Sequence, residues 1–393
     1  MNEVFMVSAV RTAIGTFGGS LRGATPCELG ALVVREAVGR ADVAPDSIGH
    51  VVFGQVIQTA PEDNYLARVA GVNGGLPHQI PALTVNRLCG SGLQAIVSAA
   101  QSILLGDCDI AVAGGAEVMS RAPFHAPDMR WGRKMGNSTL VDTLEGSLRD
   151  PFGRMPMGVT AENLAARHKI SREDQDALAH ESQRRAALAL TAGHFREQIV
   201  PVEVRGRRGI EQFVTDEHIR GETTLEDLAR LKPIFKTEDG TVTAGNASGI
   251  NDGAAAVVLA SAAAVTTHGL KPLARLVSYG HAGVDPAYMG IGPVPSTKSA
   301  VAKAAVSIDE LDVIEANEAF AAQAIAVSRE LGFDPARVNP NGSGISLGHP
   351  VGATGVIITT KLVHELQRTG GRLGLATMCI GGGQGISVIW ERC

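Results

Sequence analysis

Residues 86–95 read Asn86-Arg87-Leu88-Cys89-Gly90-Ser91-Gly92-Leu93-Gln94-Ala95, and they join a short strand to a helix of small residues. The apolar run 82–85 predicts the strand, and the helix is expected from about Gly90 to Leu105. Cys89 thus stands at a helix N-terminus, where unpaired N–H groups are expected to lower the pKa of the thiol. The glycines on either side of Ser91 are expected to let a substrate approach the backbone. A buried, inert cysteine is the alternative interpretation.

The composition is that of a globular chain with more than one domain. Its 393 residues are too many for one core, and 45% hydrophobic with 19% charged residues exclude a disordered chain. The net charge of −5 argues against broad nucleic-acid binding. The five cysteines lack the spacings of a disulfide framework or a zinc site, so no metal is expected. The segment from Met1 has no basic signal region and the most apolar run, 253–265, is too short to cross a bilayer; we expect a cytoplasmic protein without membrane contact.

Short buried strands alternate with Ala- and Gly-rich helices, which favours an α/β fold. A helix is predicted over 26–38 from a capping box and is expected to end at Gly39. Strands are predicted over 50–56 and 109–113, the second ending at Gly114-Gly115.

The segment from about Ser120 to Gly249 has more charge and less regular apolar spacing, so we interpret it as an inserted loop or lid domain. One helix is predicted inside it, capped by Ser171 and ended by Gly193. Its clustered basic residues are expected to be solvated loop charges: Arg130, Arg133, Lys134, Arg205, Arg207 and Arg208.

The C-terminal third repeats the pattern of the N-terminal third. Val85-Asn86 before Cys89 corresponds to Val338-Asn339 before His349, and Gly114-Gly115 corresponds to Gly381-Gly382-Gly383. Two copies of one α/β unit around a pseudo-two-fold axis would start equivalent helices at Cys89 and His349 and bring these residues together.

Four segments collect reactive residues: the Cys89 segment, Glu315-Ala316-Asn317-Glu318-Ala319-Phe320, the glycine-rich run 339–355 around His349, and Cys379-Ile380-Gly381-Gly382-Gly383-Gln384-Gly385. Together with Ala244-Gly245-Asn246-Ala247-Ser248-Gly249, their order and separations resemble the thiolase family along essentially the whole chain, above all the bacterial β-ketothiolase and acetyl-CoA acetyltransferase group. The resemblance implies two duplicated α/β units packed as a five-layer α-β-α-β-α sandwich. The N-terminal half would comprise residues 1–120 plus 250–271, the C-terminal half 272–393, and the CoA-binding loop domain 121–249.

The chemistry of the reactive residues fits the same reaction. Acyl transfer between thiols needs a thiolate, and His349 is suited to take the proton of Cys89. Carbon–carbon bond formation needs a base at the α-carbon, and Cys379, as a thiol of pKa about 8, would serve as base and acid. The resemblance implies one oxyanion hole from the backbone N–H groups of Cys89 and Gly381, and another from His349 with a water held by Asn317. A satisfied core histidine and a helix-capping asparagine are the alternatives for His349 and Asn317.

Binding of coenzyme A is implied by the resemblance alone, because the chain has no phosphate-loop motif. Ser248 would contact the pantetheine and Arg220 the nucleotide phosphates. Apolar residues would line the channel, with plain core packing as the alternative: Leu148, Met157, Phe235, Ala244, Met289, Ala319 and Phe320. Acyl-CoA substrates, no permanently bound cofactor and a homotetramer (a dimer of dimers, with contacts near Arg130) are further implications.

One departure concerns substrate length. Many short-chain family members carry His-Met-Gly where this chain reads Pro156-Met157-Gly158. The lost polar group predicts tolerance of acyl chains beyond acetoacetyl, and a degradative 3-ketoacyl-CoA thiolase of broader chain length is the alternative. A decarboxylating ketosynthase and a non-catalytic acyl-CoA or lipid carrier are the other hypotheses. The set Cys89, Asn317, His349 and Cys379 argues against both.

Overall fold

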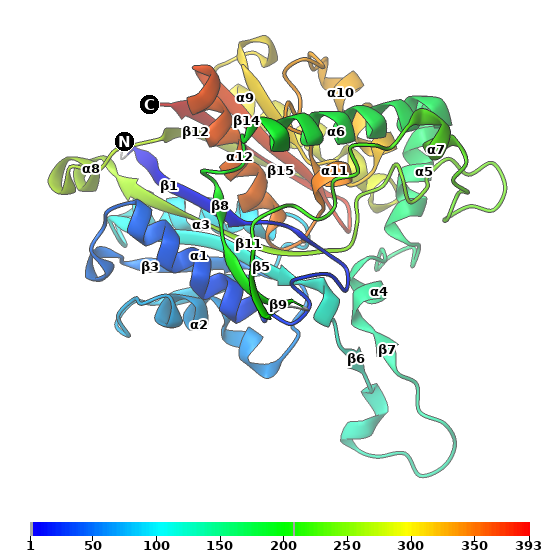
Figure 1. The fold of residues 1–393 in the computed structure, drawn as a ribbon, viewed down its shortest axis with the longest axis horizontal. Helices are drawn as coiled ribbons and strands as arrows, with labels where there is room; N and C mark the ends of the chain where they lie inside the picture. Colours follow the sequence, from blue (N-terminus) through cyan, green and yellow to red (C-terminus); the bar gives the residue numbers. More distant parts are fainter. Residues whose placement is uncertain (1–2, 207–208) are drawn as a thin grey trace.

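The computed structural model describes residues 3–206 and 209–393, and each half of the chain builds a sheet with the same strand order (Figure 1). In the first half, neighbouring strands are β4 (Ala82–Val85), β3 (His50–Gly54), β5 (Ile110–Val118), β11 (Asn251–Ser261) and β1 (Val4–Thr12). In the second half they are β13 (Val313–Ala316), β14 (Leu373–Ile380), β15 (Gln384–Arg392) and β12 (Ala274–Gly283). In the second half, Val338 forms a parallel bridge with Ile314 of β13 and so takes the position that β4 has in the first half.

The pairing directions match as well as the order. In each half the first two pairings are parallel and the last two antiparallel. Val85 lies on β4, which pairs with β3, and Val338 pairs with β13 in the same direction. The predicted correspondence of Val85 and Val338 is therefore also present in the strand pairing. The predicted duplication of one α/β unit is confirmed.

Helices complete five layers. The central layer is α3 (Ser91–Leu105) with α12 (Thr354–Thr369), which pack on each other and touch strands of both halves. One outer layer is α1 (Pro26–Arg40) with α2 (Leu66–Asn73) on the first half, and the other is α9 (Pro293–Ala304) with α10 (Ala321–Leu331) on the second. Strands β1 and β12 pair at Met6 and Ala274, so the two sheets are continuous at one edge. The five-layer α/β sandwich is confirmed.

Glycines let the two central helices meet. A Cβ on Gly92 would stand 2.8 Å from the Val356 nitrogen, and one on Gly355 would stand 2.2 Å from the Leu93 nitrogen. A Cβ on Gly90 would lie 2.4 Å from the Ile380 side chain. The glycines around Ser91 therefore serve close packing of the core, and the expectation that they admit a substrate is wrong.

Three predicted boundaries differ from the structure. Helix α1 has the predicted capping box but continues through Gly39 to Arg40, and β3 ends at Gly54 rather than at residue 56. Strand β5 continues through Gly114-Gly115 to Val118. These glycines do not end the strand: a Cβ on Gly114 would meet the Phe53 ring at 2.2 Å, and one on Gly115 would meet the Gly352 oxygen at 2.4 Å. Gly114 and Gly115 leave room for these neighbours within the strand. The predicted correspondence between Gly114-Gly115 and the turn Gly381-Gly382-Gly383 is therefore wrong.

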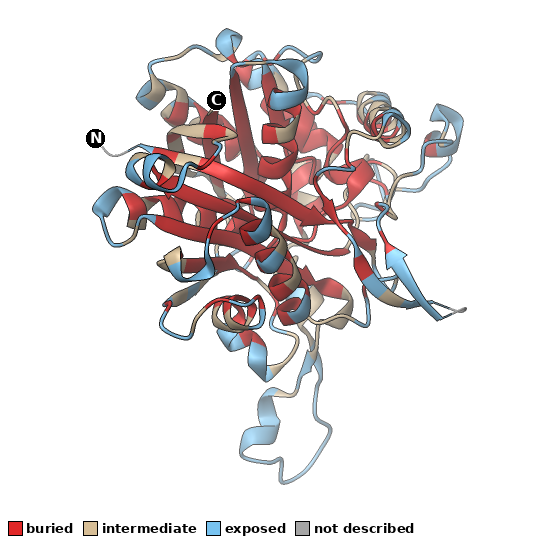
Figure 2. Cartoon of the chain, turned by 60° about the vertical axis from the view of Figure 1, so that its left-hand side comes forward, coloured by how far each residue is buried: buried red, intermediate tan, exposed pale blue. Residues whose placement is uncertain are grey.

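The inserted segment is fastened to both halves. Strands β6 (Phe124–His125) and β7 (Val141–Asp142) pair at the base of an exposed arm that projects from the body (Figures 1 and 2). The predicted helix is α6, bounded by Ser171 and Gly193. Its other elements are α4 (Thr143–Ser147), α5 (Met157–His168), α7 (Leu225–Ala229), β8 (Ile199–Val200), β9 (Val202–Gly206) and β10 (Gly209–Phe213). Helices α5 and α6 pack on α10, and β8 pairs with β1.

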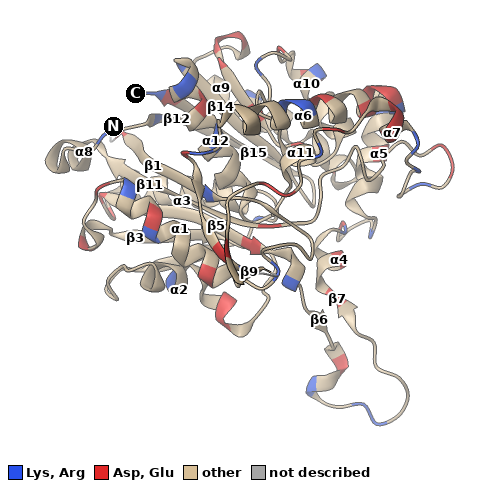
Figure 3. Cartoon of the chain, in the orientation of Figure 1, with Lys and Arg blue, Asp and Glu red and all other residues tan. Residues whose placement is uncertain are grey.

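Short elements complete the order and do not change the layers. They are β2 (Gly15–Thr16), α8 (Ala262–His268), α11 (Gly344–Leu347) and the 3₁₀ turns Pro45–Ser47, Pro61–Tyr65, Met119–Arg121, Pro127–Arg130, Pro286–Ile291 and Ile308–Glu310. Within the residues that the structure describes, one segment, 88–105, is long and apolar enough to cross a membrane; it contains α3, and more than half of it is buried in the central layer. Figure 3 shows basic and acidic residues interspersed around the outside, with few on the central strands.

Candidate active site

A cavity of about 690 Å³ is lined by residues of both halves and of the inserted segment. Cys89, His349, Cys379 and Gly381 line it. Cys89 precedes α3, His349 lies in the loop before α12, and Cys379 lies near the end of β14, followed by the Gly381 turn. The structure thus brings the predicted reactive residues together, although His349 stands five residues before Thr354, where α12 begins.

The turn that presents Cys89 is held by Ser91. The Ser91 hydroxyl donates to the Leu88 oxygen at 2.6 Å and accepts the Arg87 N–H at 2.9 Å. Leu88 has a φ of 45°, a conformation that a leucine adopts at an energetic cost. The sequence predicts a helix start at this point, whereas the left-handed residue before the cysteine is evident only in the folded structure.

The pKa of Cys89 moves against the expectation. Burial raises the pKa of the Cys89 thiol, and the backbone N–H groups of Gly381 and of Cys89 itself lower it by a smaller amount. The charge of Glu117 raises it further. The N–H groups act on the sulfur as predicted, but desolvation outweighs them, so the resting group is a thiol that needs a base.

His349 is held as a neutral base. Its Nδ1 lies 2.7 Å from the Thr354 hydroxyl, which itself donates to the Pro350 oxygen at 2.8 Å. The Thr354 hydroxyl proton is engaged in that hydrogen bond, so the Thr354 oxygen accepts the proton carried by His349 Nδ1. His349 Nε2 then carries no proton and can accept one. Burial lowers the pKa of His349 to about 4, so the ring is uncharged at neutral pH. The backbone N–H of His349 donates to Asn251 at 2.9 Å and fixes the loop.

Cys379 lies deeper than Cys89. It is 1% exposed and packs with Met157, Met289 and Ala319. Burial and then the charge of Cys89 raise the pKa of the Cys379 thiol far above its ordinary value. The expected pKa of about 8 is therefore wrong for the resting protein, because the surroundings are apolar and the nearest ionisable group is another thiol.

Asn317 lies behind His349 rather than on the cavity wall. Its Nδ2 is 3.5 Å from Nε2 of His349, and its buried Oδ1 has no hydrogen-bond partner within the described part of the chain. The residue comes directly after β13, at the edge where β13 and β14 end. An unpartnered buried carbonyl oxygen beside the imidazole fits the prediction that Asn317 holds a water.

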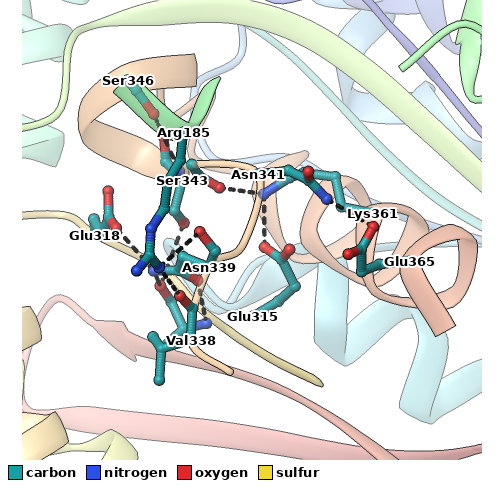
Figure 4. Close-up of polar contacts among 12 residues, drawn as sticks. Arg185, Glu315, Glu318, Val338, Asn339, Asn341, Ser343, Ser346, Lys361 and Glu365 are labelled. Carbon is teal, nitrogen blue, oxygen red and sulfur yellow. Dashed lines mark hydrogen bonds and ion pairs between the residues drawn. The ribbon is translucent and has the colours of Figure 1, made fainter. Parts of the chain in front are cut away.

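A buried polar network fixes the backbone on both sides of Asn317 (Figure 4). The side chain of Asn339 accepts the Ala316 N–H at 2.9 Å and donates to the Ala316 oxygen at 2.8 Å, as a neighbouring strand would. It also donates to Glu318 at 2.8 Å. In the same network, Lys361 pairs with Glu315 at 2.6 Å, and both side chains are buried. The network ties the Asn317 segment to the segment that leads to His349.

Most predicted CoA-binding residues line the cavity. They are Leu148, Met157, Phe235, Ala244, Ser248, Met289, Ala319 and Phe320. Phe235 and Phe320 meet edge to face with centroids 6.2 Å apart, and the Ser248 N–H donates to the Ala319 oxygen at 2.9 Å. Arg220 does not line the cavity, because its guanidinium donates to the Glu217 and Ile219 oxygens. Its charge still lowers the pKa of His218, which does line the cavity, after the larger effect of burial.

Sequence reasoning missed several lining residues. Met119, Leu144 and Val351 pack together with Cys89, and His218 presents an Nδ1 without a hydrogen-bond partner among the described residues. Charged residues of the inserted segment also line the cavity: Asp142, Glu145 and Arg149. Val351 lies in the glycine-rich run around His349, whereas the other positions belong to no recognisable motif and only the tertiary contacts reveal them.

The remaining predictions concern the basic clusters, the cysteines and metal binding. Arg130, Arg133 and Lys134 are exposed in the arm, but Arg205 lies on strand β9 rather than in a loop. Arg207 and Arg208 lie outside the described residues. All five cysteines are free thiols, and the described ranges contain no cluster of three or more His, Cys, Asp or Glu residues arranged to hold a metal ion.

Comparison with known proteins places the whole chain in one family. Residues 4–263 match the family described as "Thiolase, N-terminal domain", and residues 270–392 match "Thiolase, C-terminal domain". The chain is 66% identical to beta-ketothiolase BktB of Cupriavidus necator, over 99% of each chain, and 51% identical to an acetyl-CoA acetyltransferase of Pseudomonas aeruginosa, over 100% of each. It is similar to the crystal structure of human mitochondrial 3-ketoacyl-CoA thiolase in complex with CoA, with a TM-score of 0.96, 46% identity and coverage of 100% of this chain and 98% of that one. By its sequence and its fold, this chain belongs to the thiolase family.

Proposed function

We propose that this chain condenses acetyl-CoA with an acyl-CoA and, in reverse, cleaves a 3-ketoacyl-CoA with coenzyme A. The observation that carries the proposal is the convergence of two thiols, Cys89 and Cys379, with neutral His349 around one cavity, while Asn317 lies behind the imidazole. The similarity to beta-ketothiolase BktB and to an acetyl-CoA acetyltransferase over the full length supports the same reaction.

The first step transfers an acyl group to Cys89. His349 Nε2 takes the thiol proton, and the sulfur attacks the thioester carbonyl of the acyl-CoA. The bond from the carbonyl carbon to the CoA sulfur breaks, and CoA leaves with the proton returned by His349. The N–H groups of Cys89 and Gly381, which act on the Cys89 sulfur in the resting protein, stabilise the oxygen of the tetrahedral intermediate.

The second step forms the carbon–carbon bond. His349 Nε2 takes the proton of the Cys379 thiol, the resulting thiolate takes an α-proton from acetyl-CoA, and the carbanion attacks the acyl carbon on Cys89. The protonated Nε2 of His349 and the water held by Asn317 stabilise the enolate oxygen. The Cys89 thioester then breaks and its sulfur receives the proton from His349, so both thiols and the neutral imidazole are restored. The raised pKa of Cys379 makes it a strong base once ionised and keeps it protonated as the acid for thiolysis.

For the substrate we propose short 3-ketoacyl-CoAs, including chains beyond acetoacetyl. Pro156 lines the cavity and offers no polar side-chain group, and Met119, Leu144 and Val351 are apolar neighbours of Cys89. An apolar wall gains about 0.8 kcal/mol for each methylene that it buries. A degradative enzyme of broader chain length is the second candidate, and it is favoured by the 48% identity to a mitochondrial 3-ketoacyl-CoA thiolase of Bos taurus.

We further propose a cytoplasmic homotetramer, assembled as a dimer of dimers. Reduced thiols at Cys89 and Cys379 fit the cytoplasm. The arm between β6 and β7 exposes Trp131 at 92% and Met135 at 89%, large apolar side chains that fit a contact with another copy. Light scattering on the full chain should give four copies, and Trp131→Gln should shift the population to smaller assemblies. A monomer for both proteins would contradict the assembly.

The reaction is tested by trapping its intermediate. Acetyl-CoA alone should release CoA and leave one acetyl group on the peptide that contains Cys89, and longer incubation should yield acetoacetyl-CoA. Peptide mass spectrometry and thiol detection measure both. Stoichiometric CoA binding without acylation would indicate a carrier, and release of CO₂ from malonyl thioesters would indicate a ketosynthase; either result contradicts the proposal.

A further inference from the structure

One buried carboxylate beside the site has no part in the two chemical steps. Glu117 is 0% exposed and lies on β5, a strand of the first half. Its Oε2 accepts the Val56 N–H and the Gly352 N–H, each at 2.9 Å, and its Oε1 accepts the Ile57 N–H at 3.0 Å. Val56 and Ile57 belong to the first half, but Gly352 belongs to the His349 loop of the second half. Glu117 is therefore a bridge between the two catalytic halves.

The packing around Gly352 leaves no freedom at this bridge. A Cβ on Gly352 would stand 2.4 Å from Glu117 Oε2, and a Cβ on Gly115 would stand 2.4 Å from the Gly352 oxygen. A Cβ on Gly54 would stand 2.8 Å from the same oxygen. Gly115 and Glu117 lie on one face of β5, because side chains two apart on a strand point the same way. The Gly352 peptide is thus held at its oxygen by close packing and at its nitrogen by the carboxylate.

The hydrogen-bond partners of Glu117 suit an anion. All three of its partners are N–H donors, and a protonated carboxyl would find no acceptor among them. Burial raises the pKa of Glu117 to about 8, although the three N–H groups lower it and the charge of Asp63 raises it again, so the carboxylate is charged in the alkaline range in which the Cys89 thiol titrates. The Glu117 charge also reaches Cys89 and raises the pKa of that thiol.

We infer that Glu117 is a positioning residue, which fixes the His349 loop of one half in register with Cys89 of the other. The inference rests on the proposed function, because it explains how His349 Nε2 is kept in reach of the Cys89 sulfur. Misplacement by about 1 Å in such an arrangement costs on the order of 10²-fold in rate.

The test replaces the carboxylate by its amide in the full-length protein. Glu117→Gln must place its NH₂ group either against the Ile57 N–H or against the Val56 and Gly352 N–H groups, so the bridge is broken on one side, and kcat should fall by about 10²-fold with little change in KM. The pH midpoint for alkylation of Cys89 by iodoacetamide should move down, because a negative charge near the sulfur is lost. Glu117→Asp keeps the charge but shortens the side chain, so its kcat should also fall while the alkylation midpoint stays near that of the unchanged protein.

Glu162→Gln is the matched control. Glu162 is a buried carboxylate that accepts the Thr241 and Val242 N–H groups at 2.8 Å, and it does not line the cavity. Both Gln variants should lose thermal stability, but only Glu117→Gln should move the alkylation midpoint. Unchanged kcat in Glu117→Gln, or an equal loss of kcat in Glu162→Gln, would overturn the inference. The alkylation comparison needs no turnover, so it separates failure of this inference from failure of the proposed reaction.

Discussion

The two halves share one strand order but differ in the connection that follows β5 in the first half and β14 in the second. In the first half, β5 leads into the inserted segment of residues 121–249 before the chain returns as β11. In the second half, β14 turns directly into β15 through Gly381-Gly382-Gly383. The long connection supplies most of the apolar cavity wall, and the short one places Cys379 and the Gly381 N–H against Cys89.

The difference shows how a duplicated fold supports a two-step reaction. Equivalent loops before α3 and α12 present a nucleophile in one half and a base in the other, and neither half holds both. The first half is proposed to carry the acyl group, whereas the second is proposed to handle protons and the enolate. Variants in the two halves should therefore fail at different steps.

The largest effect is expected at the first-half nucleophile. Cys89→Ser should reduce turnover by roughly 10⁴-fold, because the hydroxyl ionises far less readily than the thiol, although its loop is unchanged. Steady-state thiolysis of acetoacetyl-CoA measures the loss. Near-normal turnover would show that the acyl group is not carried at Cys89.

The second-half thiol should separate the steps. Cys379→Ala should still form acyl-Cys89, but it should lose α-proton exchange and condensation by about 10³-fold or more, because no base faces the α-carbon. Exchange of the acetyl protons of acetyl-CoA in D₂O, monitored by NMR, reports the second step alone. Exchange at the normal rate would assign the base elsewhere.

Asn317→Ala should give an intermediate effect in the same direction. Loss of one oxyanion donor costs about 10²–10³-fold, and here it should fall on condensation more than on acylation. The ratio of the two single-turnover rates measures this. Equal losses in both steps would show that Asn317 also serves the oxyanion hole used in acylation. That result would contradict the assignment of the two steps to different halves.

The pH dependence should be asymmetric. Burial lowers the pKa of His349 to about 4, so the base stays neutral and acylation persists until the pH falls towards that value. Burial raises the pKa of Cys89, so direct alkylation of this thiol should increase with pH and reach its midpoint above that of an ordinary thiol. Rapid-quench acylation and iodoacetamide kinetics across the acidic to alkaline range check both; an alkylation midpoint on the acid side of neutrality would contradict the desolvated thiol.

The smallest effect concerns the inserted segment. Pro156→His should lower the ratio of activity on 3-ketohexanoyl-CoA to that on acetoacetyl-CoA by a few-fold. The substitution adds a polar group to an apolar wall, and burial of each substrate methylene against such a wall stabilises the complex by about 0.8 kcal/mol. Competition between the two substrates measures the ratio. Met135→Gln in the distant arm is the control and should leave the ratio unchanged.

Much of the fold could be predicted because it depends on local patterns. The capping boxes at Thr25 and Ser171, the strand before Cys89 and the correspondence between Val85 and Val338 all match observed elements. The errors at Gly90 and Gly114-Gly115 share one cause. These predictions rest on local conformational freedom, but glycines in the interior also serve close packing, which depends on distant neighbours. Gly39 is exposed with open space around it, and there helix α1 continues to Arg40.

By itself, the sequence determined the family, the two-unit architecture and the identity of the four reactive side chains, because these lie in contiguous motifs. Only the tertiary structure decided the ionisation of Cys89 and Cys379, since desolvation depends on everything packed around a sulfur. It also decided that Arg220 turns to its own backbone, and that Glu117 joins the two catalytic halves. Such contacts link residues far apart in the chain, and no local pattern records them.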